Sequence, residues 1–352
     1  MTKYKITKTD NKTIPCTTTI EVTIPADVII AKKADAIKNI GEHINVDGFR
    51  PGHIPEKIIT QKVGEIGVYE EATRNVLDEV FFEIISETKE LPVNRPDILI
   101  TKIALDTDAE VKITFATKPI VKLGDYKKVK KNFADKKPKD EDGKATEKEI
   151  EDMIMNLRKQ VAHMQYHHNN PDDHGHNHAE LEPAALDDEF AKLCGPFNNL
   201  ADLNKAIVEN IEQSKKQKNL EKFRIELIDA IIADSDIVYP EFILNSEIDI
   251  MIEELKGDLQ RMGQSFEEYL SVVNKKVEDI RAERKDMADK RVKTQLTLSE
   301  IAHAEKIELN QEDIAKQIAE IKNVHKDAPD ENIKMFVERF EMNRAVWKML
   351  EE

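Results

Sequence analysis

Helical periodicity dominates the second half of the sequence and constrains the fold more than any other feature. From Glu147 almost to the end, apolar residues recur every three or four positions, as one face of a helix requires. This periodicity predicts helices at about 150–164, 200–235, 239–260, 265–307, 310–325 and 330–350. The chain holds only 11 glycines and 35% charged residues, a composition that suits long helices with solvated surfaces. We therefore expect an elongated all-α domain over residues 148–352.

The first 120 residues follow a mixed pattern. Residues 16–25 alternate apolar and polar side chains, which predicts a half-buried strand, and residues 30–44 then change to a helical period. A second helix is expected from Pro55, and a longer one from Val68 to Lys89. The buried stripe of the longer helix would be Ala72, Val76, Val80 and Ile84, widened by Leu77, Phe81 and Ile85. Two paired strands, "DILITKIAL" and "AEVKITFATKP", complete an α+β domain over residues 1–120 and a mainly helical chain overall.

Charge excludes one class of function and marks a linker. The chain carries 53 Lys and Arg against 69 Asp and Glu, a net charge of −16, so it is no general nucleic-acid binder. Residues 1–62 alone have a charge of +3, so one end could face a polyanion. Residues 121–147 are rich in lysine and acids with little to bury, which predicts a charged linker, although its lysines could also touch RNA.

No segment of the sequence resembles a secretion signal or a membrane span. The stretch "MTKYKITKTD" lacks an apolar core, and no later run approaches about 20 apolar residues. We expect a cytoplasmic protein without a membrane partner. The two cysteines, Cys16 and Cys194, are expected to be free thiols.

The connection "NVDGFRPGHIP" (45–55) concentrates special residues between two expected helices. Gly48 and Gly52 allow backbone angles closed to other residues, while the two prolines restrict theirs. Such a loop could present Phe49 and Arg50 to a partner, because both residue types recur at binding hot spots. The alternative is a tight helix-helix turn with Phe49 folded into the core.

The chain as a whole resembles bacterial trigger factor, the ribosome-associated folding chaperone. "GFRPGHIP" is similar to a family pattern Gly-Phe-Arg-x-Gly-Lys-x-Pro, and five further segments follow in family order. These segments are "LPVNRPDI", "KPIVKLGDY", "LDDEFAKL", "YPEFILNSEI" and "AEKIELNQEDI". The resemblance implies an ATP-independent chaperone whose first domain docks on the large ribosomal subunit, on protein and rRNA at the exit tunnel. The implied docking residues are Gly48, Phe49, Arg50, Pro51, Gly52 and His53.

The sequence departs from the family pattern in two places. The family inserts a peptidyl-prolyl isomerase domain where this chain has only residues 165–183, so we expect no enzyme activity. The family also places lysines where Pro51 and His53 stand, which leaves Arg50 as the permanent cation of the loop.

Clients of such a chaperone are unfolded or nascent polypeptides, which need exposed apolar surface to bind. Candidate contacts lie in one apolar helical region, although stripes of this kind are more often core. They are Ile243, Leu244, Ile248, Met251, Ile252, Leu255, Met262, Phe266 and Leu270. No phosphate-binding glycine loop is present, so binding and release would be passive and without a cofactor.

A histidine-rich tract, "HHNNPDDHGHNH" (167–178), replaces the expected isomerase domain. His174, His176 and His178 could hold adventitious zinc or nickel, but a solvated connector is expected there whatever its composition. The sequence thus leaves three functions open: a ribosome-docked chaperone, a ribosome-independent helical holdase or assembly chaperone, and a metal-binding protein. A weak homodimer of the free protein is also compatible with the family resemblance.

Overall fold

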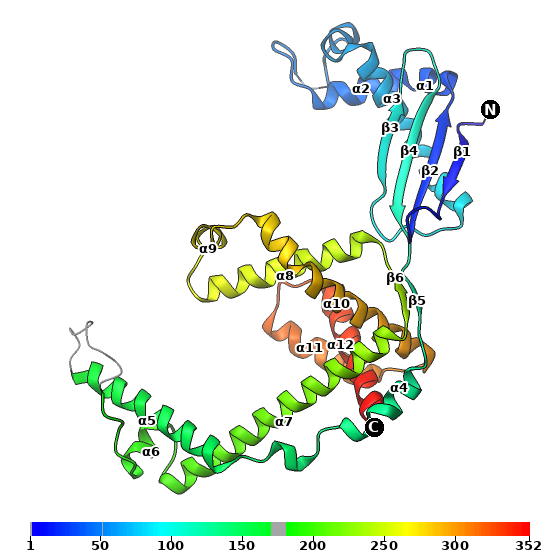
Figure 1. Cartoon of the computed structure of the whole chain (residues 1–352). Coiled ribbons are helices and arrows are strands. Elements are labelled where there is room, and N and C mark those ends of the chain that lie inside the picture. Colours follow the sequence, from blue (N-terminus) through cyan, green and yellow to red (C-terminus); the bar gives the residue numbers. More distant parts are fainter. Residues whose placement is uncertain (1, 51, 170–180) are drawn as a thin grey trace. The chain divides into compact units, whose positions relative to one another are not determined.

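The computed structural model describes residues 2–50, 52–169 and 181–352. The chain divides into two compact units, each assembled from separate stretches of sequence (Figure 1). The first comprises Met1–Leu123 and Ser235–Glu308, and the second comprises Gly124–Asp234 and Leu309–Glu352. The division therefore cuts across the boundaries expected from the sequence, because residues 235–308 group with the N-terminal part.

A four-stranded antiparallel sheet forms the N-terminal part of the first unit. Its order is β1(Lys5–Asp10), β2(Thr17–Ile24), β4(Ala109–Ala116) and β3(Asp97–Lys102). The central pair is in register, with Ile20 opposite Ile113 and Val22 opposite Val111, and all four side chains are buried. The strands expected at 16–25 and in the two later segments are confirmed, whereas the edge strand β1 was not expected.

Three helices supply the apolar side chains that pack against this sheet: α1(Ala26–Ala31), α2(Lys33–His43) and α3(Glu56–Thr88). In α3 the expected stripe is buried from Ala72 to Ile85, except Phe81, which is half-buried. The two helices expected here form one element interrupted at Gly64, whose φ of 78° and ψ of 158° are not helical. In Figure 1 the α2–α3 pair extends beyond the end of the sheet and carries the connecting loop.

The remainder of the first unit is helical apart from one short strand pair. β5(Ile120–Lys122) pairs with β6(Asp236–Val238), and α8(Glu241–Arg261), α9(Phe266–Val273) and α10(Val277–Ala304) follow. The single helix expected at 265–307 is divided because Asn274 has a φ of 52° and ends α9, and a capping interaction at Lys276 and Asp279 begins α10.

The second unit consists of helices: α4(Tyr126–Phe133), two short 3₁₀ helices (Ala134–Lys136 and Asp140–Gly143), α5(Glu147–Asn169), α6(Asp188–Cys194), α7(Leu200–Ala233), α11(Gln311–Val324) and α12(Asp330–Glu351). Asp187, Asn199 and Asn310 accept backbone hydrogen bonds at the starts of α6, α7 and α11. The long helix expected at 200–235 is α7 almost to the residue.

The lysine-rich stretch expected to be a linker contains α4 and both 3₁₀ helices. Phe133 lies against Phe223 of α7 with ring centroids 6.5 Å apart, and Lys130 donates to the Met349 carbonyl at 2.6 Å. The lysine side chains can thus cap and cover neighbouring helices while their charges stay near solvent.

The expected fold class is confirmed: an α+β N-terminal domain precedes a helical remainder, in which the short pair of β5 and β6 supplies the only strands among the described residues. None of the helices in the described ranges combines the length and the apolar character needed to cross a membrane.

Candidate functional site

The loop between α2 and α3 is shaped by two glycines with positive φ. Gly48 has a φ of 85° and Gly52 a φ of 80°, in the region that L side chains rarely adopt. A Cβ added at Gly48 would meet nothing within 4 Å, so glycine is needed there for its backbone angles rather than for space. Each glycine belongs to a tight turn: Phe49 N–H donates to the Val46 carbonyl at 3.1 Å, and His53 N–H donates to the Arg50 carbonyl at 3.0 Å.

The loop is anchored to both helices that it joins. Gly52 N–H donates to the Gly41 carbonyl near the end of α2 at 2.8 Å. Ile54 is buried, and Lys62 of α3 donates to the Asn45 carbonyl. A Cβ at Gly41 would lie 2.8 Å from the Ile59 methyl, so the two helices approach closely at the base of the loop. These contacts reduce the conformational freedom that a partner would otherwise have to remove.

Three candidate side chains point to solvent from this anchored loop. Phe49 is 39% exposed, and Arg50 and His53 are exposed. The alternative in which Phe49 fills the core is therefore not what the structure shows. Pro51, the remaining candidate, lies outside the described residues. Among interactions between described residues, the Arg50 guanidinium takes part in no ion pair or hydrogen bond.

The charge around the loop is mixed rather than basic. Arg50 and Lys57 are exposed, and so are the carboxylates Glu42, Asp47 and Glu56. The loop region therefore lacks the concentrated positive charge that drives non-specific binding to nucleic acid. Any recognition by this loop depends on the positions of Phe49 and Arg50 more than on a long-range field.

Most of the client contacts expected in α8 and α9 are core residues. Leu244, Ile248, Met251, Ile252 and Phe266 are buried in a cluster that includes Ala288 of α10, and Leu255 and Leu270 pack against it. Ile243 is half-buried. Met262 is the exception among the nine, with 80% of its surface exposed. Apolar periodicity correctly located this helix face, but the face is covered by α9 and α10.

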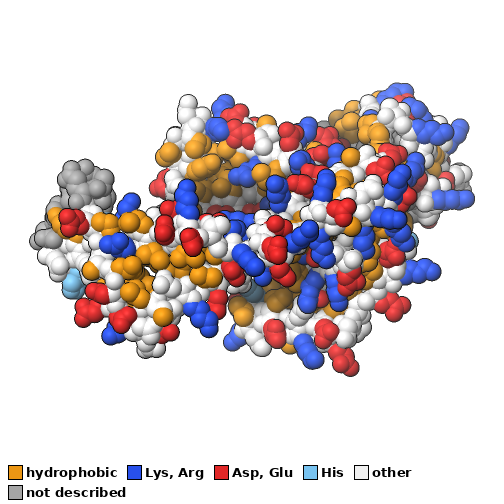
Figure 2. All heavy atoms as spheres, turned by 60° about the horizontal axis from the view of Figure 1, so that its bottom comes forward, with side chains coloured by type: hydrophobic (Ala, Val, Ile, Leu, Met, Phe, Trp, Pro, Cys, Tyr) orange, Lys and Arg blue, Asp and Glu red, His pale blue; other side chains and the backbone are white. Residues whose placement is uncertain are grey.

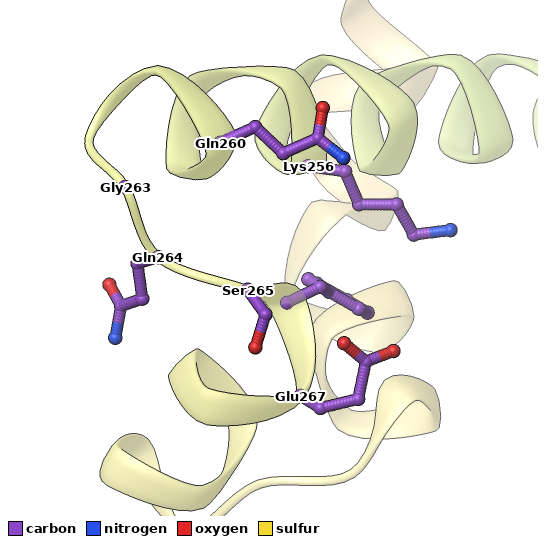
Figure 3. Close-up of a pocket in the computed structure, with 7 residues that line it drawn as sticks. Lys256, Gln260, Gly263, Gln264, Ser265 and Glu267 are labelled. Atoms are coloured by element: carbon purple, nitrogen blue, oxygen red, sulfur yellow. The ribbon is translucent and has the colours of Figure 1, made fainter.

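The turn between α8 and α9 holds a hollow lined by polar groups. In Figure 3, Lys256 and Gln260 of α8 lie across the hollow from Ser265 and Glu267. Lys256 Nζ lies 5.4 Å from the centroid of the Phe266 ring. Ser265 N–H donates to the Glu268 carboxylate at 2.9 Å, and this bond lowers the pKa of Glu268. The hollow is lined by charged and amide groups together with Phe266, so its lining is mixed and gives a client no continuous apolar surface.

Exposed apolar side chains occur instead at helical positions that sequence reasoning did not select. Figure 2 shows hydrophobic side chains gathered on the part of the molecule that carries the grey residues, where α5 and α6 lie. The exposed members on these helices and the preceding loop are Met153, Met155, Met164, Leu186 and Leu193. On α12, the exposed Phe336 and Phe340 stack with centroids 6.3 Å apart, and Met335 is exposed beside them. The sequence held a signal for this pair. Phe336 and Phe340 are four residues apart, so they lie on the same face of a helix and can contact each other.

The three histidines expected as metal ligands, His174, His176 and His178, lie outside the described residues. Within the described ranges, no three His, Cys, Asp or Glu side chains come together as a metal site would require. Cys16 and Cys194 are free thiols, and burial raises the pKa of both.

Comparison with known proteins gives a consistent result along the chain. A family model described as bacterial trigger factor protein matches residues 4–157, and a model of the trigger factor C-terminus matches residues 199–352. Trigger factor of Staphylococcus carnosus is 26% identical, with 85% of this chain and 84% of that protein covered. Trigger factor of Halalkalibacterium halodurans is also 26% identical, with 88% and 89% covered.

A solved chain from the work "Promiscuous Substrate Recognition in Folding and Assembly Activities of the Trigger Factor Chaperone" aligns with a TM-score of 0.47 and 16% identity, over 98% of this chain and 99% of that chain. The assignment rests on the two family models, which together span most of the sequence. Between them lie only residues 158–198, fewer than the roughly 50 residues of a small domain, so this chain has no isomerase domain at that place. The chain belongs to the bacterial trigger factor family.

Proposed function

We propose that this protein is an ATP-independent chaperone of the cytoplasm that docks on the large ribosomal subunit near the exit tunnel. The observation that carries the proposal is the anchored α2–α3 loop, which holds Phe49 and Arg50 exposed. Arg50 offers planar donors to rRNA phosphate or to a carboxylate of ribosomal protein, and Phe49 offers apolar area to a protein groove. The two turns of the loop, which contain Gly48 and Gly52, hold Phe49 and Arg50 in fixed directions before docking.

Clients bind, in this proposal, to the exposed apolar side chains of the helices. Burying apolar area contributes roughly 25 cal/mol per Å², so a few aromatic and methionine side chains give weak, reversible contacts. Methionine suits varied clients because its unbranched thioether adapts its shape. Holding an unfolded chain in this way is mass action on the unfolded state, and it needs neither nucleotide nor another cofactor.

Co-sedimentation with translating ribosomes tests the docking step. We expect Arg50→Ala to weaken ribosome binding and to reduce the dependence of log K on log salt by about one if the lost contact is a phosphate. Arg74→Ala is the matched control, because Arg74 is exposed on α3 and pairs within its own helix with Glu70 at 2.8 Å. Equal binding of Arg50→Ala and the unchanged protein over a range of salt would contradict docking through this loop.

Suppression of aggregation of a chemically unfolded enzyme tests the client surface. Replacing Phe336 and Phe340 by serine removes the stacked pair, and we expect a higher protein concentration to be needed for half-maximal protection. Lys334→Ser on the same helix is the control. Lys334 is exposed, and its replacement removes no apolar side chain from the surface of α12. Unchanged protection by the double variant would remove α12 from the client surface.

A ribosome-independent holdase is the second candidate, and the mixed charge around the loop favours it. The exposed carboxylates of Glu42, Asp47 and Glu56 occur in the same segment as the exposed cations, and His53 stands where the family has a lysine. If this candidate is right, Arg50→Ala does not change the amount of protein that co-sediments with ribosomes from a cell extract. The variant with Phe336 and Phe340 replaced by serine still suppresses client aggregation less well than the unchanged protein. Sedimentation of the free protein over a concentration series would show whether a weak homodimer forms.

A further inference from the structure

A pair of histidines near the end of α5 has the geometry of a metal clamp. His163 and His167 are one helical turn apart, so their side chains project from the same face of α5. Their Nε2 atoms lie 3.1 Å apart, and the ring centroids are 4.4 Å apart with planes at 75°. Both residues lie within the described part of the chain and are half-buried.

The nitrogen separation matches what a shared metal ion would require. Zinc-bound imidazole nitrogens lie about 2.0–2.1 Å from the metal. Two such bonds with nitrogens 3.1 Å apart enclose an angle of about 100°, close to the tetrahedral value. Without a metal, one ring can donate its Nε2 proton to the other, and which ring donates depends on the tautomer. Both nitrogens must be free of protons to bind a metal.

We propose that His163 and His167 bind a divalent transition metal ion, of the class of Zn²⁺, Ni²⁺ or Cu²⁺. Imidazole is a ligand that these ions share, and no thiolate takes part. The proposal concerns these two residues of α5, and it goes beyond the proposed chaperone function. The ion bridges positions i and i+4 of one helix, so it stabilises the last turns of α5.

The neighbouring residues indicate binding without hydrolysis. In the metalloprotease pattern His-Glu-x-x-His, a glutamate follows the first histidine and acts as general base. Here Met164 occupies that position, and it is half exposed. Tyr166 stands beside the pair, with its ring centroid 6.2 Å from that of His167. Among the described residues, the clamp therefore offers two imidazole ligands and no general base.

Calorimetric titration of the full chain with Zn²⁺ and Ni²⁺ tests the site. We expect His163→Gln and His167→Gln each to weaken the tightest binding step by more than about tenfold, the loss typical of disturbed metal sites. His43→Gln is the matched control, because His43 is exposed on α2 and its Nδ1 lies 2.9 Å from its own helix carbonyl, that of Asn39. This control should bind metal as the unchanged protein does.

A second variant separates the clamp from the histidine-rich tract. With His174, His176 and His178 all replaced by serine, the tightest step should persist, and metal should still raise the thermal stability of the chain. Loss of that step in the triple variant, or its survival in His163→Gln, would overturn the proposal. Circular dichroism of each variant confirms that its helix content is unchanged, so a loss of binding reports the ligand and not the fold.

Discussion

The N-terminal sheet domain and the helical second unit bury their apolar residues in different ways. In the sheet domain, 18 buried residues form one continuous cluster; they come from the central strands β2 and β4, from the three helices and from Tyr4 just before β1. In the second unit, six buried residues around α5, α6 and α7 form one small cluster and three between α11 and α12 form another, and further buried residues lie elsewhere on α7 and α12. The difference suits different tasks: one continuous core holds a loop in a fixed position, and small clusters leave apolar side chains at the surface for partners of variable shape.

The largest expected effect comes from the continuous core. Ile113 in β4 is fully buried opposite Ile20, and Ile113→Ala should lower the free energy of unfolding by about 2–5 kcal/mol. Ile98→Ala on the edge strand β3, where Ile98 is 40% exposed, should cost much less. Urea unfolding followed by circular dichroism measures both. Similar losses for the two variants would show that the central strand of the sheet contributes no more to stability than its edge strand does.

The next effect concerns the loop that this core holds. Gly48→Ala introduces a side chain at a φ of 85°, which costs about 1–2 kcal/mol although the added Cβ meets no neighbour. We expect ribosome binding to weaken several-fold. Gly48→Asn is the informative partner variant, since asparagine tolerates left-handed backbone angles better than alanine does. If both variants bind ribosomes as the unchanged protein does, the preset shape of the loop does not matter for docking.

The smallest effect is a pH dependence in the second unit. Glu149 accepts from Thr146 N–H at 2.8 Å and from Lys215 of α7 at 2.9 Å. The Thr146 backbone N–H is the largest cause that lowers the pKa of Glu149 from 4.5 to about 2. Because the folded pKa is lower than the unfolded one, the stabilisation is complete above pH 4.5 and is lost as pH falls toward 2.

Glu149→Gln should remove this part of the acid sensitivity at the start of α5. Hydrogen exchange of α5 amides between pH 5 and 3, corrected for intrinsic rates, measures it. Glu147→Gln at the first residue of α5 controls for the loss of one carboxylate from the same turn. If the exchange rates of Glu149→Gln and of the unchanged protein depend on pH in the same way, the Glu149 carboxylate does not hold the start of α5 to α7.

Long apolar stripes made most of the helices predictable, since a stripe spanning several turns has few alternatives. Shorter elements were missed for identifiable reasons. β1 carries Lys5 and Lys8 on an exposed edge, and its apolar and polar side chains show little alternation. Its pairing with β2, rather than burial of its own side chains, holds it in the sheet. The break between α9 and α10 depends on backbone angles at Asn274, which apolar periodicity does not report.

The candidate sites show the same limit. The glycines and prolines of the loop indicated a turn with fixed angles, and the side chains at 49 and 50 are exposed as a docking loop requires. For α8, the apolar stripe was correctly identified, but a stripe contains no information about whether a neighbouring helix covers it. The histidine pair was missed because the neighbouring tract has more histidines, although the i, i+4 spacing of His163 and His167 is visible in the sequence.

The break in α3 at Gly64 separates the turns next to the α2–α3 loop from the turns that pack against the sheet. The turns from Glu56 to Val63 carry the loop, whereas the turns from Val68 onward are buried against the sheet. The two backbone angles of Gly64 thus set the direction of the first turns of α3 relative to the rest of the helix, and the contacts with α2 hold the loop to both helices. A Cβ at Gly64 would meet nothing within 4 Å, so its φ of 78°, and not a lack of space, is what favours glycine there. A substitution at Gly64 is therefore expected to change the direction of the α2–α3 loop while Phe49 and Arg50 stay in place in the sequence.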